Sequence, residues 1–313
     1  MPPSAPAAPS ASAAPSAPAA PRPMIGIGLM LLAMAVLPFI DVIAKHLGQT
    51  GVPILLIVWA RVAFGTLLTL PVALHQGGRP ALWPDRPVYH TVRAGFLLAA
   101  TGLFFLSLTH MPIADALAIF FVQPLVLTAL SPLILGEHVG PRRWAAVAVG
   151  FAGMLIIIRP GFQTLNPGMG FAFAAGVSLA LYFLMTRRIA GRAPAMVTTY
   201  QTNLMGAGVL TLALPLFWQT PDAVTWGLFA TLGLIATLGH LFIVMSYDHA
   251  EASLLAPLAY TEIVMATLLG WWVFGDLPDG WTVLGVSILI ASASYIALRE
   301  QALGRSRKTR PSL

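Results

Sequence analysis

The sequence has no cysteine and is poor in charged residues, which make up only 9% of its 313 residues. Without cysteine, the chain forms neither a disulfide nor a thiolate metal site, and its redox compartment stays undetermined. A soluble domain carries about 25% charged residues, so the composition excludes an ordinary soluble protein. The positive residues are scattered over many segments rather than gathered in one patch, which argues against a nucleic-acid partner.

What the sequence does contain is mostly apolar: 58% of the residues are hydrophobic and the mean hydropathy is +0.82. A helix needs about 20 mainly apolar residues to cross a bilayer, and nearly the whole chain after Met24 divides into such runs. Lipid tolerates only backbones that satisfy their hydrogen bonds internally, so each run is predicted to be a helix. We therefore predict an all-α integral membrane protein with ten transmembrane helices. The spans are 24–45, 53–74, 89–109, 113–135, 143–158, 168–187, 195–217, 223–247, 252–274 and 281–298.

The two ends of the chain differ from this pattern. Residues 1–23 are almost entirely Pro, Ala and Ser with a single charge, Arg22. Such a segment has too little apolar surface to bury, so it is predicted to be a disordered tail. It lacks the basic start and the apolar centre of a secretory signal. Residues 300–313 are rich in arginine and are predicted to form a basic cytoplasmic tail.

The chain also contains a weak internal repeat. Residues 258–296 match the fourth and fifth spans at a constant offset of 139, and an earlier segment recurs at an offset of 141. Order and spacing indicate that one five-span unit was duplicated, with a first repeat at 24–161 and a second at 162–299. Equivalent residues are Gln123 and Glu262, Gly136 and Gly275, Glu137 and Asp276, Trp59 and Tyr200, and Gly65 and Gly206.

The arginine residues predict the orientation. When the N-terminus is placed inside, most of them, Arg93 included, fall in cytoplasmic segments, as the positive-inside rule requires. Both termini are then cytoplasmic, and five spans per repeat place the two repeats in opposite orientations. The hinges that follow the fourth and ninth spans agree with this opposite orientation. The first, HVGPRRW at 138–144, is basic and predicted inside, and the second, DLPDGW at 276–281, is acidic and predicted outside. Arginine in excess of lysine suggests a GC-rich bacterial genome, so we expect a bacterial inner membrane.

Several local motifs fit one known family. They are Asp41-x-x-x-Lys45, Val58-Trp59-Ala60-Arg61, and LxLGEHVGPRRW at 133–144 followed by GFAG. With the two five-span repeats, the chain from about 24 to 300 resembles the EamA-type branch of the drug/metabolite transporter superfamily. The resemblance implies ten helices around a central cavity that moves small organic solutes. Asp41 with Lys45 is most similar to the subgroup that contains riboflavin and S-adenosylmethionine permeases.

Asp41 and Arg61 are charged residues within predicted spans. On insertion scales such a residue costs about 2.5–3.5 kcal/mol, so it needs a partner or a wet cavity. Their depths allow a pair between the first two spans. Such a pair could simply lock the helices together, or Arg61 could face a cavity and bind an anionic or carbonyl group. Lys45 lies nearer the outer surface and is predicted to snorkel to the interface.

Glu262 lies near the middle of the ninth span, and its counterpart Gln123 is polar at the equivalent depth. The two side chains predict either a polar cavity at the repeat interface or hydrogen bonds between helices. In a cavity, Glu262 could exchange a proton with each side in turn. Tyr260, a further candidate for substrate binding, points to another helix face, where it could instead serve packing alone.

The seventh span is unusually polar for a membrane helix. Thr199, Thr202 and Asn203 share one face at i, i+3 and i+4 spacing, with Tyr200 about a quarter turn away. This face is predicted to point inward, to substrate or to another helix. In the eighth span, His240 could relay protons or could hydrogen-bond to a backbone carbonyl.

Four further residues are expected to be structural. Pro124 is predicted to kink the fourth span, and Glu137 and Asp276 are hinge residues that follow the fourth and ninth spans. Asp115, at the start of the fourth span, is predicted to cap a helix near the outer surface.

Enzyme and channel classes fit less well. Asp248 and Asp276 superficially resemble an intramembrane aspartyl protease pair, but they are predicted on opposite sides of a hydrocarbon layer about 30 Å thick. The sequence has no HExxH or Gly-x-Ser-x-Gly motif and no repeated filter. We predict a secondary transporter of a small polar or zwitterionic metabolite that works by alternating access, without cofactor or metal. Proton coupling, an uncoupled facilitator and a homodimer are left open.

Overall fold

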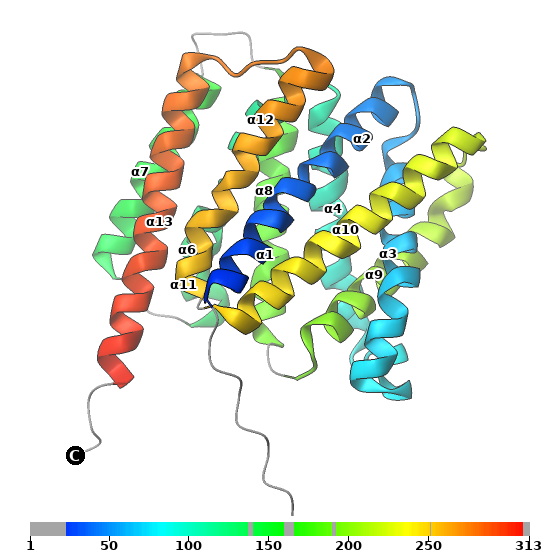
Figure 1. Ribbon diagram of the computed structural model, residues 1–313, viewed down its shortest axis with the longest axis horizontal. Helices are drawn as coiled ribbons and strands as arrows, with labels where there is room; N and C mark the ends of the chain where they lie inside the picture. The colour runs from blue at the N-terminus through cyan, green and yellow to red at the C-terminus, as the bar shows by residue number, and fades with distance from the viewer. Residues whose placement is uncertain (1–22, 137–139, 160–165, 190–191, 251, 309–313) are drawn as a thin grey trace, which may run out of the picture.

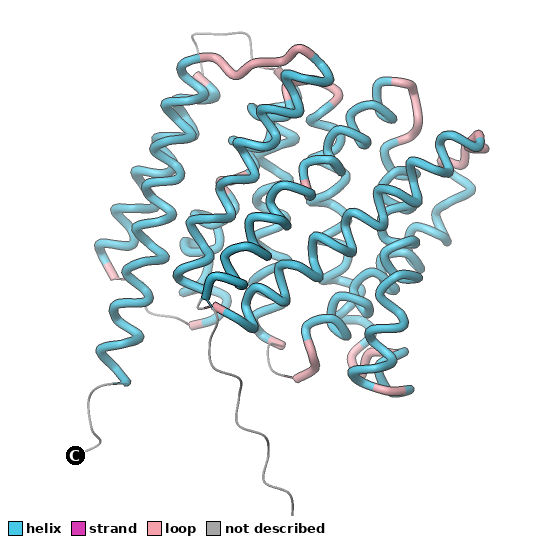
Figure 2. The backbone as a smooth tube through the Cα atoms, viewed as in Figure 1, coloured by secondary structure: helices cyan, strands magenta, loops and turns pink. Residues whose placement is uncertain are grey.

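The computed structural model describes residues 23–136, 140–159, 166–189, 192–250 and 252–308, and every regular element among them is a helix (Figure 1; Figure 2). The α-helices are α1 (Pro23–Val36), α2 (Pro38–Gln49), α3 (Ile54–Gly77), α4 (Pro87–Leu108), α5 (Ile113–Phe120), α6 (Gln123–Leu135), α7 (Pro141–Ile158), α8 (Pro167–Arg188), α9 (Ala195–Ala213), α10 (Ala223–His249), α11 (Ala252–Leu255), α12 (Thr261–Phe274) and α13 (Gly280–Lys308). Three 3-10 segments connect them: η1 (Arg79–Leu82), η2 (Leu214–Leu216) and η3 (Ala256–Tyr260). The predicted all-α architecture is confirmed for this part of the chain.

Six helical segments of the described chain are long and apolar enough to cross a membrane. They are Pro23–Gln49, Ile54–Gly77, Pro87–Leu108, Ile113–Leu135, Pro167–Arg188 and Ala223–Tyr247. Three shorter apolar helices, Trp144–Ile158, Leu258–Phe274 and Gly280–Ser292, accompany them. The chain is therefore a multi-pass membrane protein, while the count of ten spans stays a prediction.

Three predicted spans are interrupted near a proline. α1 gives way to α2 just before Pro38, α5 gives way to α6 just before Pro124, and η3, which contains Pro257, separates α11 from α12. Proline has no backbone N–H and its ring clashes with the preceding turn. Each of these spans is therefore made of shorter helical segments rather than one straight helix.

The ends of the chain differ partly from expectation. α13 continues to Lys308, into the segment predicted as a basic tail. The predicted N-terminal tail lies almost wholly outside the described residues, as does Glu137.

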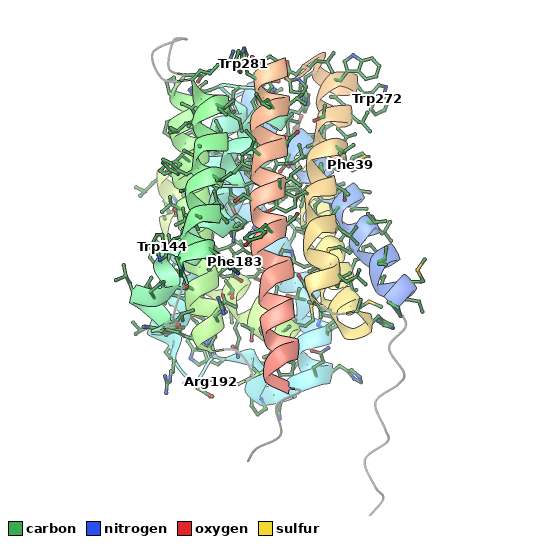
Figure 3. The ribbon with its side chains drawn as sticks, turned by 90° about the vertical axis from the view of Figure 1, so that its left-hand side faces the viewer. Phe39, Trp144, Phe183, Arg192, Trp272 and Trp281 are labelled. Atoms are coloured by element: carbon green, nitrogen blue, oxygen red, sulfur yellow. The ribbon has the colours of Figure 1, made fainter. Side chains whose placement is uncertain are left out.

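α1 begins and α13 ends at the same side of the bundle, here called the tail side, and the α12–α13 connection lies at the opposite side (Figure 1). Exposed tryptophans lie toward both sides: Trp272 and Trp281 near the opposite side, and Trp144 nearer the tail side (Figure 3). Tryptophan favours the headgroup level of a bilayer, so these residues mark two interfaces.

Helices distant in sequence pack along one another: α1 with α10, α3 with α9, α4 with α8, and α7 with α13. Small residues permit the closest of these contacts. At Gly285 of α13, an added Cβ would lie only 2.6 Å from the Gly153 carbonyl oxygen of α7 and would also meet Ile157. Two backbones therefore touch where α7 and α13 cross, as small residues allow in membranes.

Replacing Gly285 with alanine is expected to destabilise the folded protein. The new methyl group must push two backbones apart, and overpacking of this kind costs about 1–3 kcal/mol. The thermal midpoint of the purified protein in detergent should fall. Gly95→Ala in α4 is the matched control, because nothing lies within 4 Å of its Cβ position. Equal midpoints for the two variants would contradict the close contact.

Candidate functional site

A small polar cavity lies between α3, α4, α8, α9 and α10. The free space is about 20 Å³, enough for one or two water molecules. Its polar lining includes Arg61, Thr69, Tyr182, Thr199, Asn203 and His240. The cavity therefore collects hydrogen-bonding groups from helices of both halves of the chain, in an otherwise apolar bundle.

Arg61 supplies the positive charge of the cavity. Its Nη1 donates a hydrogen bond to Thr101 Oγ1 of α4 at 3.2 Å. Asp41 is close enough to interact electrostatically with Arg61, but no hydrogen bond or ion pair joins the two side chains. The expected Asp41–Arg61 salt bridge is therefore not formed in this structure, and within the described chain the guanidinium hydrogen-bonds to Thr101 alone.

Two carboxylates that the sequence argument singled out lie outside the cavity lining. Asp41 of α2 is 7% exposed, and Glu262 is the second residue of α12. The two carboxylates are near enough to interact electrostatically. Among the described residues, neither forms an ion pair or accepts a hydrogen bond. A buried charged group without a partner is costly, so the buried Asp41 carboxyl needs either a proton or a cation, whereas Glu262 is partly exposed.

His240 lines the cavity from α10. Its Nδ1 lies 3.2 Å from the Ala236 carbonyl oxygen, one of the two arrangements expected for this residue. If Nδ1 donates there, Nε2 is left as an acceptor. His240 also interacts electrostatically with Arg61, so the ring belongs to the same polar group.

The polar face of α9 divides between two places. Thr199 and Asn203 line the cavity, and Asn203 packs against Gly65 of α3, where an added Cβ would lie 2.9 Å from Asn203 Nδ2. Tyr200 instead belongs to a separate apolar cluster that includes Ala73 and Ala81. The α-helical period thus explains why neighbouring polar residues reach different surroundings.

Arg93 is not a loop charge, as the orientation argument assumed. It is fully buried in α4, where it donates to the Thr198 carbonyl at 3.0 Å and to the Thr202 hydroxyl. It also lies over the Tyr182 ring, 5.6 Å from the centre. Arg93 therefore fastens α4 to α8 and α9, and Thr202, which also lines the cavity, contributes to that contact.

Other expected residues lie outside the cavity. Tyr260 is buried and packs on Phe121, with ring centres 5.1 Å apart. Gln123 and Pro124 begin α6 and do not belong to the cavity lining. Asp276, expected to be a structural hinge residue, follows the left-handed Gly275 at the end of α12 and forms an ion pair with Lys45.

Two expectations near the surface are wrong. Lys45 does not snorkel, because it is 4% exposed and its Nζ lies 2.6 Å from Asp276 Oδ2. The ion pair with Asp276 outweighs the gain from reaching water. Asp115 does not cap a helix: Pro112 is the N-cap residue of α5, without a side-chain cap. Asp115 Oδ1 is buried and has no hydrogen-bond partner in the described part of the chain.

Tyr182 is the main cavity residue that the sequence argument missed. It lies in an apolar stretch, where a tyrosine attracts no attention. The repeat offset offers a signal, because Tyr182 is the equivalent of Asp41, and Thr202 is the equivalent of Arg61. Equivalent positions in the two repeats therefore lie at or beside one cavity.

Among the described residues, no group of three or more His, Asp or Glu side chains is placed to hold a metal ion.

Comparisons with known proteins agree with a transport site. The EamA-like transporter family model matches residues 24–159 and again residues 166–298. The S-adenosylmethionine uptake transporter of Rickettsia prowazekii is 25% identical over 276 residues, covering 88% of this chain and 93% of that protein. The riboflavin transporter of Vibrio cholerae is 29% identical over 291 residues, covering 92% and 97%. A solved crystal structure shares the fold with a TM-score of 0.61 at 22% identity, covering 90% of this chain and 97% of that chain.

Proposed function

The chain belongs to the EamA-like transporter family, and we propose that it carries a small zwitterionic metabolite across a bacterial inner membrane by alternating access. It is a small-metabolite transporter rather than an enzyme, as its family and its relatives are. S-adenosylmethionine, named for one group of relatives, is the first substrate to consider, because it carries a carboxylate together with cationic groups.

Arg61 lines the cavity and forms no ion pair with Asp41 or Glu262 in the described chain, and this arrangement supports a zwitterion. Arg61 offers free donors to a carboxylate, and a guanidinium binds a carboxylate through two parallel hydrogen bonds. Asp41 is near Arg61 and Glu262 is near Asp41, and neither carboxyl forms an ion pair in the described chain. The substrate carboxylate would bind Arg61, with Thr199 and Asn203 around it, and the cationic end would face the two carboxyls.

The substrate must enter a cavity that now holds only one or two waters. A metabolite of this size needs several hundred Å³, so the helices must separate on one side before it can bind. Inverted repeats with a site at their interface provide such a motion, because one repeat rocks against the other. The two stretches matched by the family model and the charge distribution support ten spans, inverted repeats and cytoplasmic termini.

Purified protein in liposomes should take up radiolabelled S-adenosylmethionine with saturable kinetics, and unlabelled S-adenosylmethionine on the inside should accelerate entry of the label by counterflow. Protein-free liposomes are the control. Riboflavin, which lacks both charges, is the second probe because other relatives are named for it. Saturable riboflavin uptake without any S-adenosylmethionine uptake would contradict the zwitterion assignment.

A further inference from the structure

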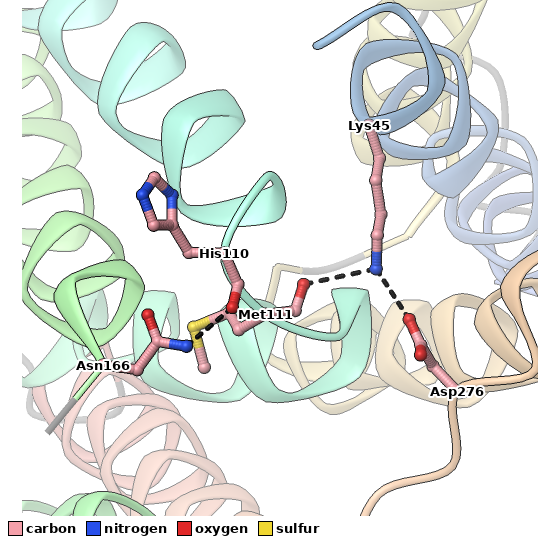
Figure 4. Close-up of polar contacts among 5 residues, drawn as sticks. All are labelled: Lys45, His110, Met111, Asn166 and Asp276. Atoms are coloured by element: carbon pink, nitrogen blue, oxygen red, sulfur yellow. Dashed lines mark hydrogen bonds and ion pairs between the residues drawn. The ribbon is translucent and has the colours of Figure 1, made fainter. Parts of the chain in front are cut away.

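On the side opposite the tails, Lys45 of α2 joins distant parts of the chain. Its Nζ donates a hydrogen bond to Asp276 Oδ2 at 2.6 Å and another to the Met111 carbonyl at 3.3 Å (Figure 4). The ammonium also lies 4.7 Å from the centre of the Phe274 ring. The Asp276 side chain is 30% exposed, so water can compete for it. We call Lys45 and Asp276 the Lys45 latch.

On the tail side, Arg188 makes a comparable contact. Lying at the end of α8, it donates a hydrogen bond to the Ile134 carbonyl in the last turn of α6. A cation at the carbonyl end of a helix is favoured by the helix dipole. The Arg188 side chain is exposed, so water can replace this contact too. We call Arg188 and Ile134 the Arg188 latch.

The two latches occupy related positions in the proposed repeats. α6 and α12 both end on a left-handed glycine, Gly136 with φ 69° and Gly275 with φ 73°, and these glycines are equivalent at the offset of 139. At the offset of 141, Lys45 is equivalent to Thr186, about half a helical turn before Arg188. Each latch therefore ties the first span of one repeat to the end of the fourth span of the other.

The helix packing has the same symmetry. α4 against α8 pairs the third span of the first repeat with the first span of the second, and α1 against α10 is the same pairing with the repeats exchanged. α3 against α9 pairs the second spans of the two repeats, and α7 against α13 pairs their fifth spans. Exchanging the repeats therefore leaves both pairs unchanged. In inverted repeats, exchanging the repeats also exchanges the two sides of the membrane.

We propose that the Lys45 latch and the Arg188 latch are the two gates of one transport cycle, one for each side of the membrane. This inference rests on the proposed alternating access. Breaking the Lys45 latch frees α2 from the end of α12 and opens the cavity to the side opposite the tails. Breaking the Arg188 latch frees α8 from the end of α6 and opens it to the tail side. Both latches are formed here and the cavity is small, as in the closed state between the two open ones.

A single introduced cysteine can report which side is open, since the chain has none of its own. Thr237→Cys places a thiol in the cavity lining on α10. A membrane-impermeant maleimide is then applied to right-side-out and to inside-out vesicles. Adding Lys45→Gln should raise the labelling rate from the side opposite the tails about tenfold and lower it from the tail side, because losing one latch shifts the conformational equilibrium. Adding Arg188→Gln should have the reverse effect.

Matched controls use exposed side chains near each latch. His46→Gln on α2 and Arg192→Gln on the tail side should label like Thr237→Cys alone. If Lys45→Gln folds poorly, Asp276→Asn removes the same ion pair and should give the same shift. The exchanged pair Lys45→Asp with Asp276→Lys should return labelling toward the reference rate.

Unchanged labelling in both latch variants, or an increase from the same side in both, would overturn the proposal. Labelling needs no substrate, so failure of S-adenosylmethionine transport alone would count against the proposed function and not against the gates.

Discussion

Replacing Arg61 with glutamine is expected to slow S-adenosylmethionine transport at least about 30-fold. Truncating one partner of a buried, hydrogen-bonded charge pair costs about 2–5 kcal/mol, and each 1.4 kcal/mol is a factor of ten. Glutamine can still bond to Thr101, the neighbour of Arg61 on α4, so the helices keep their contact while the substrate carboxylate loses its cation. Initial uptake rates into liposomes, with the protein amount matched, measure the effect.

Two further variants separate binding from folding. Arg61→Lys keeps the charge but offers a point-like ammonium in place of a planar fork, so its rate should lie between those of the native protein and Arg61→Gln. His46→Gln, at an exposed position of α2, should transport normally. A folded Arg61→Gln protein with the native initial rate would show that Arg61 does not bind the substrate.

Much of the cavity could be anticipated because membrane helices obey simple geometry. The i, i+3, i+4 rule placed Thr199 and Asn203 on one face, and both line the cavity. Depth along a helix, at 1.5 Å per residue, put Arg61 among the deep charged residues. His240 could be recognised because a titratable residue in an apolar span is rare.

Contacts across the bundle could not be anticipated in the same way. Whether Lys45 turns outward to water or inward to Asp276 depends on a residue 231 positions away, which no local pattern reveals. Arg93 looked like a loop charge because it lies near the start of α4, yet α8 and α9 bury it completely. Backbone breaks near Pro38 and Pro257 were also missed, because hydropathy measures length and not straightness.

Replacing Glu262 with glutamine is expected to abolish accumulation driven by a pH gradient while leaving exchange intact. Glutamine keeps the size and hydrogen-bonding capacity of the side chain but cannot bind and release a proton. If Glu262 carries the coupled proton, a pH difference of one unit supplies about 1.4 kcal/mol per proton, which sustains about a tenfold concentration ratio of substrate. A proton and the cationic end of the substrate compete for this carboxyl and so cross in opposite directions. The variant should therefore reach a ratio of one in liposomes with an acidic interior, whereas counterflow at equal pH should continue.

Asp41→Asn tests the neighbouring carboxyl in the same assay. Asp41 and Glu262 interact electrostatically and neither forms an ion pair in the described chain, so either could hold the proton that balances the substrate charge. Loss of accumulation in Glu262→Gln alone assigns coupling to α12. Loss in Asp41→Asn alone moves the proton site to α2, beside Arg61. Native accumulation in Glu262→Gln, with the same response to a pH step, would rule this carboxyl out as the coupling group, because no proton can then be carried at that position.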